Sequence, residues 1–519
     1  MVVGDLSGIQ DYIFDIATVG AGGVARRLRA RSLFVQLITE VVCQKILKEF
    51  DLTPVNVVMS SGGKFYLLLP NTVPAKEKVK QIQQEVDNWL LQELNGELTL
   101  NLTSISFGDE GFKTEREATG FGRVLEELHE KLAERKQHRF NEALITTRGW
   151  QEKEFLRAVD FEGEKVCHSC YKFPQEKEEL CRHCFRDRDI GARLPKAKYI
   201  LFYSDGAGEI PLLDYSVSII SDIRKVSSAP QLIYKLNDSE MEAWDYRYPV
   251  LFKHLATHVP RPKGCGGCEK ASQCEAKEEQ QAQKELATFG CLAHQAKGRS
   301  LLGFMKADVD RLGVLFQFGL KRNPPVQSWD TISRLSTMSR QLDLFFNGWI
   351  EHLSQNEFPN CYTVFSGGDD LFFVGPWNRA LSFAEKVRGD FARYTQNPDI
   401  TLSVGIVINR HRYPIARAAP DAGNALETSK EEGRNSLTLL GHTVSWSDWE
   451  IVEAQWKLLQ GHLSEIPSAF LYSLIQYAET WRKYRKYERG EDGGDIAGLR
   501  FQPLLAYNLV RNMDAQKSP

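Results

Sequence analysis

The sequence predicts an α+β fold in which two ferredoxin-like domains flank a zinc-binding insert and a helical bundle follows. The order strand, helix, glycine-containing hairpin, helix and strand occurs twice at nearly the same spacing. This β-α-β-β-α-β order is the ferredoxin-like plan, and its recurrence predicts an internal duplication, with chance matching of two hairpins as the alternative. Eight of the ten cysteines lie between the two copies, and apolar residues recur at helical spacing after the second copy.

At 519 residues the chain is too long for a single core. We expect the first copy at residues 1–112, a linker domain with two cysteine clusters at 113–298, the second copy at 299–447 and the helical bundle at 448–519. The net charge of −3 gives no general attraction for nucleic acid, so such contacts need local patches or partner subunits. Without a membrane-spanning run or a signal peptide, we expect a cytoplasmic protein.

Each copy is expected to contain the same elements. In the first copy they are the strand Val2–Leu6 with Asp5, a helix from Asp11 to Ala17, a glycine-rich loop at 20–23, a basic helix with Arg26, Arg27, Arg29 and Arg31, hairpin strands Val55–Met59 and Lys64–Leu69, a helix Ala75–Leu94 and a strand Glu97–Ile105. In the second copy they are the strand Leu301–Lys306 followed by Asp308, hairpin strands Tyr362–Phe365 and Leu371–Val374, a helix Arg379–Tyr394 and a strand Ile400–Val407.

The two predicted hairpins differ in their acidic residues. Both turns contain Ser-Gly-Gly, but the second continues with Asp369-Asp370 where the first has Lys64-Phe65. Adjacent carboxylates at the tip of a rigid ribbon suit divalent metal and phosphate, although Gly and Asp are also common in solvated turns. We therefore expect metal only in the second copy. The first copy can still bind a nucleotide through Ser7, Gly8, Gly62, Gly63 and Lys64.

Asp308 is expected to lie beside Asp369 and Asp370, because a central strand adjacent to the hairpin brings them to one sheet end. Three carboxylates can hold two Mg²⁺ ions that activate a sugar hydroxyl and stabilise leaving pyrophosphate. Lys430 and Arg434 are candidates for the β- and γ-phosphates, with Asn435 for turn geometry or base contact. The alternative is an ordinary helix C-terminus, where basic residues and Gly433 are favoured. Further positive charge is expected from Arg410, His411 and Arg412.

The first cysteine cluster predicts a structural zinc site. Two Cys-x-x-Cys pairs stand ten residues apart, and each supplies two thiolates on one turn. Its members are Cys167, Cys170, Cys181 and Cys184. The second cluster, Cys265, Cys268, Cys274 and Cys291 with His294 nearby, is less regular. A second zinc, an iron–sulfur cluster and free thiols all remain open for it.

A strand-rich segment is expected between the two clusters, with strands at Tyr199–Phe202 and Leu232–Leu236. The tail from Trp446 onward is expected to form a small helical bundle with a basic face. This face, formed by Arg482, Lys483, Arg485 and Lys486, is either solvated or used by RNA or a partner subunit.

These motifs resemble a known family. Gly367-Gly368-Asp369-Asp370 together with Lys430-x-x-Gly433-Arg434-Asn435 is similar to nucleotide cyclases of the GGDEF type and to polymerase palm domains. The stretches Gly4–Gln10, Phe304–Gly313 and Leu335–Phe346, with the four-cysteine insert and the helical tail, resemble the large subunit of type III CRISPR effector complexes, the Cas-ten family. The resemblance covers nearly the whole chain and favours the Csm branch, with a type III-D-like complex as an alternative.

The resemblance implies a function. The subunit would assemble with other effector subunits and CRISPR RNA, and target RNA would trigger conversion of ATP into cyclic oligoadenylates with Mg²⁺ or Mn²⁺. One ATP would sit at Asp308, Asp369 and Asp370, and the other on the first palm. The family's hairpin serines and glycines carry over as Ser366, Gly367, Gly368, Gly62 and Gly63.

Many family members begin with a His-Asp nuclease domain. No His-Asp dipeptide occurs in this sequence, so we expect no single-stranded DNase activity of that type. Two other functions remain: a stand-alone nucleotide cyclase of the diguanylate or adenylate type, and a non-catalytic nucleotide-binding scaffold.

Overall fold

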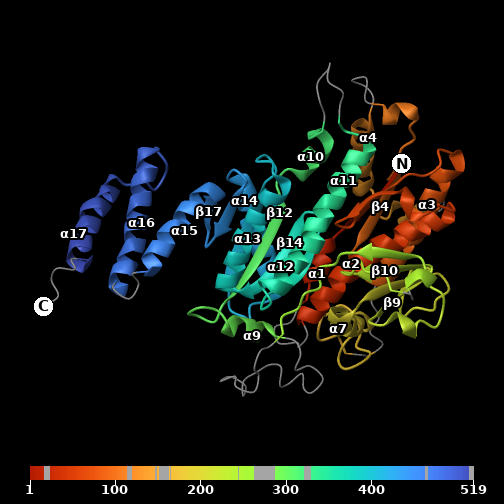
Figure 1. Cartoon of the computed structure of the whole chain (residues 1–519), viewed down its shortest axis with the longest axis horizontal. Coiled ribbons are helices and arrows are strands. Elements are labelled where there is room, and N and C mark those ends of the chain that lie inside the picture. Colours follow the sequence, from red (N-terminus) through yellow and green to blue (C-terminus); the bar gives the residue numbers. More distant parts are fainter. Residues whose placement is uncertain are drawn as a thin grey trace. The chain divides into compact units, whose positions relative to one another are not determined.

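The computed structural model describes residues 1–16, 24–113, 120–146, 149–150, 163, 165–242, 245–261, 287–320, 329–461 and 466–513. The described residues form helices together with several sheets, which confirms the predicted α+β class (Figure 1). Contacts divide the chain into two compact units, Met1–Thr443 and Val444–Pro519.

The first sheet has the strand order β2-β3-β1-β4, and the pairings of its strands are antiparallel. Its elements are β1 (Val2–Ser7), α1 (Ile9–Phe14), α2 (Val24–Glu49), β2 (Val57–Ser61), β3 (Lys64–Leu67), α3 (Val73–Leu94) and β4 (Thr99–Ser104). The predicted strands are present, but β2 continues through Ser61, so only Gly62 and Gly63 form the turn.

The second sheet repeats this order as β13-β14-β12-β15 and adds β16 and β17. Its elements are β12 (Leu302–Val309), α10 (Leu312–Phe318), α11 (Ile332–Asp343), the π-helical turn η8 (Leu344–Trp349), α12 (Ile350–Asn356), β13 (Tyr362–Gly367), β14 (Asp370–Pro376), α13 (Trp377–Thr395), β15 (Leu402–Asn409), α14 (Ile415–Glu431), β16 (Ser436–Leu439) and β17 (His442–Ser445). Strand β12 is longer than predicted, so Asp308 lies within it.

Between the two sheets the chain forms short helices and a third sheet of order β11-β10-β7-β9-β8. These elements are α4 (Phe121–Gln137), α5 (Asn141–Leu144), β5 (Ile145–Thr146), β6 (Gly149–Trp150), α7 (Arg182–Arg193), β7 (Tyr199–Tyr203), β8 (Ile210–Leu212), β9 (Tyr215–Ile220), β10 (Leu232–Leu236), β11 (Val250–Lys253) and α9 (Phe289–His294). The predicted strand-rich segment is therefore present.

Helix α2 is buried on nearly all sides, because it packs against β1, β3, α7 and β13. A helix enclosed in this way carries apolar residues around its whole circumference. Its predicted basic residues are largely internal: Arg27, Arg29 and Arg31 are each at most 6% exposed. One hydrophobic core continues through α2 and includes residues of all three large sheets.

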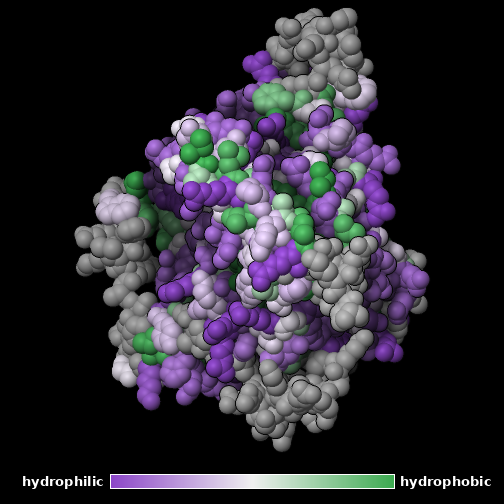
Figure 2. All heavy atoms as spheres, turned by 90° about the vertical axis from the view of Figure 1, so that its left-hand side faces the viewer, coloured by the Kyte–Doolittle hydropathy of each residue, from purple (hydrophilic) through white to green (hydrophobic). Residues whose placement is uncertain are grey.

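The C-terminal unit contains α15 (Trp446–Gly461), α16 (Ser468–Glu488) and α17 (Phe501–Met513). Several large apolar side chains of this unit are exposed, among them Leu458, Tyr472 and Val510. Figure 2 shows hydrophobic groups of this kind among polar ones on one face of the molecule. Among the described residues, no helix is long and apolar enough to span a membrane.

Candidate active site

The turns of the two predicted hairpins touch each other. A Cβ atom added to Gly368 would lie 3.1 Å from the Cα of Gly62, and one added to Gly62 would lie 3.5 Å from the Cα of Gly368. The contact is therefore between backbones. It is supported by Asp343 of α11, whose Oδ1 accepts a hydrogen bond from the Ser61 hydroxyl at 3.2 Å.

Strand register shows which residues of the two hairpins correspond. Asp5 pairs with Lys64 in the first sheet, and Asp308 pairs with Asp370 in the second. Lys64 therefore corresponds to Asp370, and the prediction that Lys64-Phe65 replaces Asp369-Asp370 was wrong by one position. Asp369 corresponds instead to Gly63.

Turn geometry explains the difference between Gly63 and Asp369. Gly62 and Gly63 both have positive φ angles, of 60° and 83°. Two consecutive positive φ angles favour glycine at both positions, as in type I′ hairpin turns. In the second hairpin only Gly368 has a positive φ, of 70°, so the next position accepts a side chain. The second turn can therefore carry an aspartate at its tip.

The three aspartates form an acidic centre. Burial, followed by the charges of Asp308 and Asp370, raises the pKa of Asp369 to about 8. Burial and the charge of Asp308 also raise the pKa of Asp370 to about 6. Crowded carboxylates of this kind favour protons or cations, and three oxygen donors suit Mg²⁺. The donor set therefore fits a divalent cation.

The carboxylates are not gathered into a closed cage. Among the described residues, only the four cysteines discussed below form a group of three or more metal-ligating side chains with all ligand atoms within 4.8 Å. Lys430 instead contacts Asp308 Oδ2 at 2.5 Å, and Gln10 donates to Asp370 Oδ2 at 3.3 Å. The ammonium group of Lys430 thus neutralises the Asp308 carboxylate.

The predicted Lys430-to-Asn435 motif forms a strained turn after α14. Gly433, Arg434 and Asn435 all have positive φ angles. Asp310 stabilises this turn, because its carboxylate accepts from the backbone N–H of Asn435 at 3.0 Å and from the hydroxyls of Thr401 and Ser403 at 2.7 Å. Non-glycine residues in this conformation cost energy and often mark functional sites.

Two pockets lie on either side of the hairpin contact. One, of about 350 Å³, is lined by Gly8, Gln10, Gly62, Lys306, Gly367, Asp369 and Asp370 among others. The second, of about 320 Å³, is lined by Asp5, Gly62, Lys64, His129, Gly368 and Asp369 among others. Each pocket combines residues of both sheets. Asp369 lines both.

In the first copy, two lysines neutralise Asp5, the counterpart of Asp308, and no second or third carboxylate stands at the hairpin turn. Asp5 contacts Lys64 at 3.2 Å and Lys136 at 2.5 Å, and the Ser7 hydroxyl lies 3.5 Å from it. The Nε2 of His129 and the hydroxyl of Tyr66 share a hydrogen bond of 2.6 Å. Burial, followed by the charge of Lys64, lowers the pKa of His129 to about 4. These residues favour an anion over a metal ion.

Ser366 differs from the prediction that it contacts ATP. Its side chain is 2% exposed, and its hydroxyl donates to the backbone carbonyl of Phe346 at 2.5 Å. The serine therefore links β13 to the π-helical turn and lines neither of the two pockets. Gly8, Gly62, Gly367 and Gly368 each line at least one of the two pockets, and their contact with nucleotide stays a prediction.

The four cysteines of the first cluster converge. Their sulfur atoms all lie within 4.8 Å of one another, and all four residues are buried. Backbone N–H groups of Ser169 and Cys184 point at the sulfurs of Cys167 and Cys181, at 3.4 and 3.5 Å. Four convergent thiols fit a tetrahedral structural zinc. The other predicted ligands Cys265, Cys268 and Cys274 lie outside the described residues, and Cys291 is half-buried in α9.

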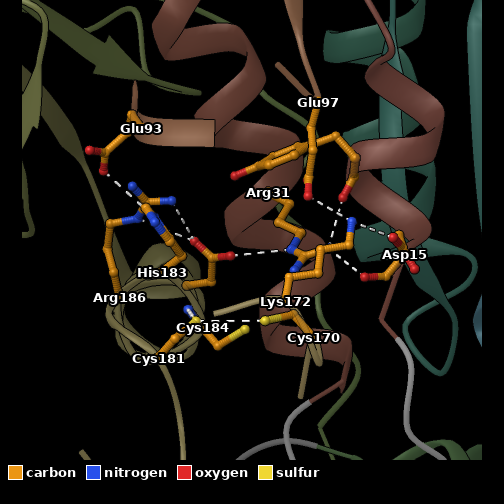
Figure 3. Close-up of polar contacts among 12 residues, drawn as sticks. Asp15, Arg31, Glu93, Glu97, Cys170, Lys172, Cys181, His183, Cys184 and Arg186 are labelled. Atoms are coloured by element: carbon orange, nitrogen blue, oxygen red, sulfur yellow. Dashed lines mark hydrogen bonds and ion pairs between the residues drawn. The ribbon is translucent and has the colours of Figure 1, made fainter. Parts of the chain in front are cut away.

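The cysteine centre is tied to the first copy by charged contacts (Figure 3). Helix α7 begins after Cys181, and its Asp187 accepts from Arg31 of α2 at 3.2 Å. Lys172, two residues after Cys170, contacts Asp15 at 2.5 Å and Glu97 at 2.7 Å. The cysteine loop therefore braces the end of α1 and the start of β4.

The raised pKa values of Asp369 and Asp370 predict a pH-dependent stability. Both aspartates hold protons in the folded chain at pH values where the unfolded chain, with pKa values near 3.8, has lost them. Their contribution to stability is therefore complete below about pH 4 and is lost as pH rises to about 8.

Without added divalent cation, we expect the melting temperature to fall by on the order of 2 °C between pH 6 and pH 8 relative to the Asp369→Asn, Asp370→Asn variant. Added Mg²⁺ or Mn²⁺ should reverse this fall. The measurement is the melting temperature of both proteins as a function of pH. The same pH dependence in both would contradict the raised pKa values of Asp369 and Asp370.

Two family models match the chain. The model of Csm1 subunit domain B matches residues 1–151, and that of the Cas10/Cmr2 second palm domain matches residues 301–438. The CRISPR system single-strand-specific deoxyribonuclease Cas10/Csm1 (subtype III-A) of Thermococcus onnurineus is 29% identical over 99% of this chain and 65% of its own length. Its counterpart in Methanocaldococcus jannaschii is 26% identical over 90% of this chain and 62% of its own length.

Most of this chain is therefore similar to Cas10/Csm1 proteins. The predicted recognition as a large subunit of type III effector complexes is confirmed. The chain spans about three fifths of the length of the curated relatives that it matches. The Cas10/Cmr2 palm match contains Asp308, Asp369, Asp370 and Lys430, so the acidic centre lies in a palm domain.

Solved Cas10/Csm1 relatives have the same fold. The Csm1 chain of a Csm1-Csm4 subcomplex in the type III-A CRISPR-Csm interference complex superposes with a TM-score of 0.71 at 25% identity, covering 98% of this chain and 64% of that chain. An apo Csm1-Csm4 cassette superposes with a TM-score of 0.69 at 25% identity, again covering 98% of this chain and 64% of that chain. A further cassette, in complex with one ATP, gives 0.70 at 24% identity, covering 96% of this chain and 63% of that chain.

Sequence reasoning missed several residues of this candidate site. Lys306 stands two positions before Asp308 on the same strand, so strand alternation could have placed it on the same face. Asp310 continues that series. Gln10 and Asp343 reach the site across the interface between the copies, and no local sequence pattern indicates that contact.

Proposed function

We propose that this chain converts ATP into cyclic oligoadenylates by nucleotidyl transfer, as a subunit of a type III CRISPR effector complex that responds to target RNA. The observation that carries the proposal is the acidic centre at the tip of β13 and β14, pressed against a second glycine hairpin with a pocket on each side. In this proposal both sheets are palms. The Cas10/Cmr2 palm match at 301–438 and the solved relatives in complex with cA3, cA4 or ATP support it.

The residues divide the reaction between the two copies. Asp308, Asp369 and Asp370 would hold Mg²⁺ or Mn²⁺, which when bound lowers the pKa of a ribose hydroxyl and offsets charge on the leaving group. In this reaction the 2′- or 3′-hydroxyl of one ribose attacks the α-phosphorus of the other nucleotide. The bond between the α-phosphorus and the bridging oxygen of pyrophosphate breaks, and the hydroxyl proton leaves to solvent. Lys430 and Lys306 supply positive charge beside the carboxylates. Arg434 and Asn435 lie on the strained turn that follows Lys430.

The second nucleotide is proposed to lie against the first copy. There Gly62 and Gly63 form a turn without carboxylates, Ser7 and Gly8 follow β1, and Lys64 and Lys136 neutralise Asp5. This leaves positive charge for a triphosphate in the pocket that Asp369 also lines. Zinc at Cys167, Cys170, Cys181 and Cys184 would be structural, because four thiolates leave no open position for a substrate.

Partners are proposed on the same basis. The solved relatives are described as Csm1-Csm4 subcomplexes, so a Csm4-like subunit is the first expected partner, together with CRISPR RNA and target RNA. The relatives' names give a single-strand-specific deoxyribonuclease activity, which is theirs and forms no part of this proposal.

The test is a product assay. The assembled complex is incubated with labelled ATP and Mg²⁺, with and without target RNA, and the products are separated by chromatography. We expect cyclic oligoadenylates only with target RNA. A cyclic dinucleotide made by the isolated chain without RNA would indicate a stand-alone cyclase. If no product forms with or without target RNA, the chain would instead be a non-catalytic nucleotide-binding scaffold.

A further inference from the structure

Gln10 belongs to the first copy but reaches the acidic centre of the second. It lies in α1, two residues after Gly8, the N-cap of this helix. Its Nε2 donates to Asp370 Oδ2 at 3.3 Å, and its Oε1 accepts from the ammonium group of Lys306. The same side chain lines the pocket of about 350 Å³ together with Lys306, Asp369 and Asp370.

The chemistry of its two partners fixes the orientation of the Gln10 amide. Its oxygen faces a cation and its NH₂ group faces a carboxylate, so each end meets the partner that it can bond. Rotating the amide by half a turn would place NH₂ against ammonium and oxygen against carboxylate. A glutamate here would repel Asp370, and a lysine would repel Lys306. A neutral side chain with one donor and one acceptor end is the type that serves both.

The backbone around Gln10 is held as firmly as its side chain. Gly8 has a φ of 88°, and a Cβ atom there would lie 2.5 Å from the carbonyl oxygen of Glu97. Helix α1 has only six residues, too few to be stable alone. Arg31 stabilises its C-terminal end by donating to the carbonyls of Tyr12 and Asp15, at 2.8 and 2.9 Å.

Arg31 also connects this helix to the cysteine centre. Its side chain is 7% exposed and bonds Asp187 of α7, which is 1% exposed. Figure 3 shows Arg31 between the cysteine loop and the end of α1, with Lys172 bonded to Asp15 beside it. A continuous set of contacts therefore runs from Cys181 through α7 and Arg31 to α1, and from Gln10 to Asp370.

We propose that Gln10 is a positioning residue that holds Asp370 and Lys306 in the arrangement that binds a divalent cation, and that it does so across the interface between the two copies. This inference rests on the proposed function, because it assumes a metal site at the three aspartates. It means that the site in the second copy is complete only when α1 of the first copy is docked against it.

The test measures Mn²⁺ binding to the full chain, in the parent protein and in Gln10→Met. Methionine has nearly the length of glutamine but neither amide group, so it removes both hydrogen bonds without opening a large cavity. Hydrogen bonds to charged groups are stronger than those between neutral groups, so we expect Mn²⁺ binding to weaken about tenfold or more. In the assembled complex, kcat for ATP conversion should fall while KM for ATP is unchanged.

Two controls separate the outcomes. Gln81→Ala changes an exposed glutamine of α3 in the same copy and should leave Mn²⁺ affinity as in the parent. Asp369→Asn with Asp370→Asn identifies the Mn²⁺ signal that belongs to this site. Equal or tighter Mn²⁺ binding by Gln10→Met, with an unchanged melting temperature, would overturn the positioning role while leaving the proposed function intact. A parent chain with no Mn²⁺ signal at the aspartates would overturn the proposed metal site and this inference with it.

Discussion

Replacing Asp369 and Asp370 together by asparagine is expected to abolish nucleotide synthesis by the assembled complex, with a loss of at least about a thousandfold. Asparagine keeps the size of each side chain but removes the charges that would hold a divalent cation. Asp308 would remain, paired with Lys430. The measurement is the yield of labelled oligoadenylate in the presence of target RNA, alongside gel filtration to follow assembly.

The same double variant is expected to unfold at a higher temperature than the parent protein. Both carboxylates are buried near other carboxylates, so their charged forms are unfavourable, and the amides remove this repulsion. Catalysis and stability therefore change in opposite directions. A lower melting temperature or a failure to assemble would show that the aspartates have a structural role. Glu431→Gln with Glu432→Gln is the matched control, since these adjacent acids are exposed at the end of α14 and should leave both properties unchanged.

Replacing Cys167 and Cys181 by serine is expected to release zinc and destabilise the first copy. Structural zinc contributes directly to folding, and loss of such a site is among the few changes that cost more than about 4 kcal/mol. The loss of α7 packing would leave Arg31 buried without Asp187, and an unpaired buried charge is strongly destabilising. Metal analysis should give about one zinc per parent chain from this site and none per variant, and the melting temperature should fall by about 8 °C or more.

A second cysteine variant controls for the loss of a buried thiol. Cys43→Ala removes a thiol of α2 that is 1% exposed and lies outside the cysteine centre. The Cys43→Ala variant should keep its zinc, and its melting temperature should fall much less than that of the variant with serine at Cys167 and Cys181. An unchanged zinc content after all four cysteines of the centre are replaced would exclude the zinc assignment. A zinc-free variant with the parent's melting temperature would remove the bracing role of the centre.

Much of the fold follows from local patterns. The short apolar runs on both sides of each Ser-Gly-Gly sequence predict a hairpin, and the repeated order predicts two sheets with one strand order. Cys167, Cys170, Cys181 and Cys184 converge because each Cys-x-x-Cys pair lies on a tight turn, which is a local property. The placement of Asp308 beside Asp370 follows from the pairing of a central strand with the hairpin.

The rest depends on contacts between distant segments. The correspondence between the two hairpins differs by one residue from the prediction, because strand register and φ angles rather than residue names decide which positions are equivalent. Ser366 faces the π-helical turn instead of a pocket, and only the packing of η8 shows this. Three arginines of α2 suggest a surface patch by charge, yet α7 and β13 cover them.

The direct contact between Gly62 and Gly368 has a consequence for the spacing of the two pockets. Side chains adopt several rotamers, so a contact made through them allows a range of separations. Here backbone atoms meet backbone atoms, and neither glycine has a χ angle. In the proposed function, the distance between a nucleotide on one hairpin and a nucleotide on the other would therefore be set by covalent chain geometry and van der Waals radii. Two substrates held in this proposed way would present the attacking hydroxyl and the phosphorus at a reproducible distance in every turnover.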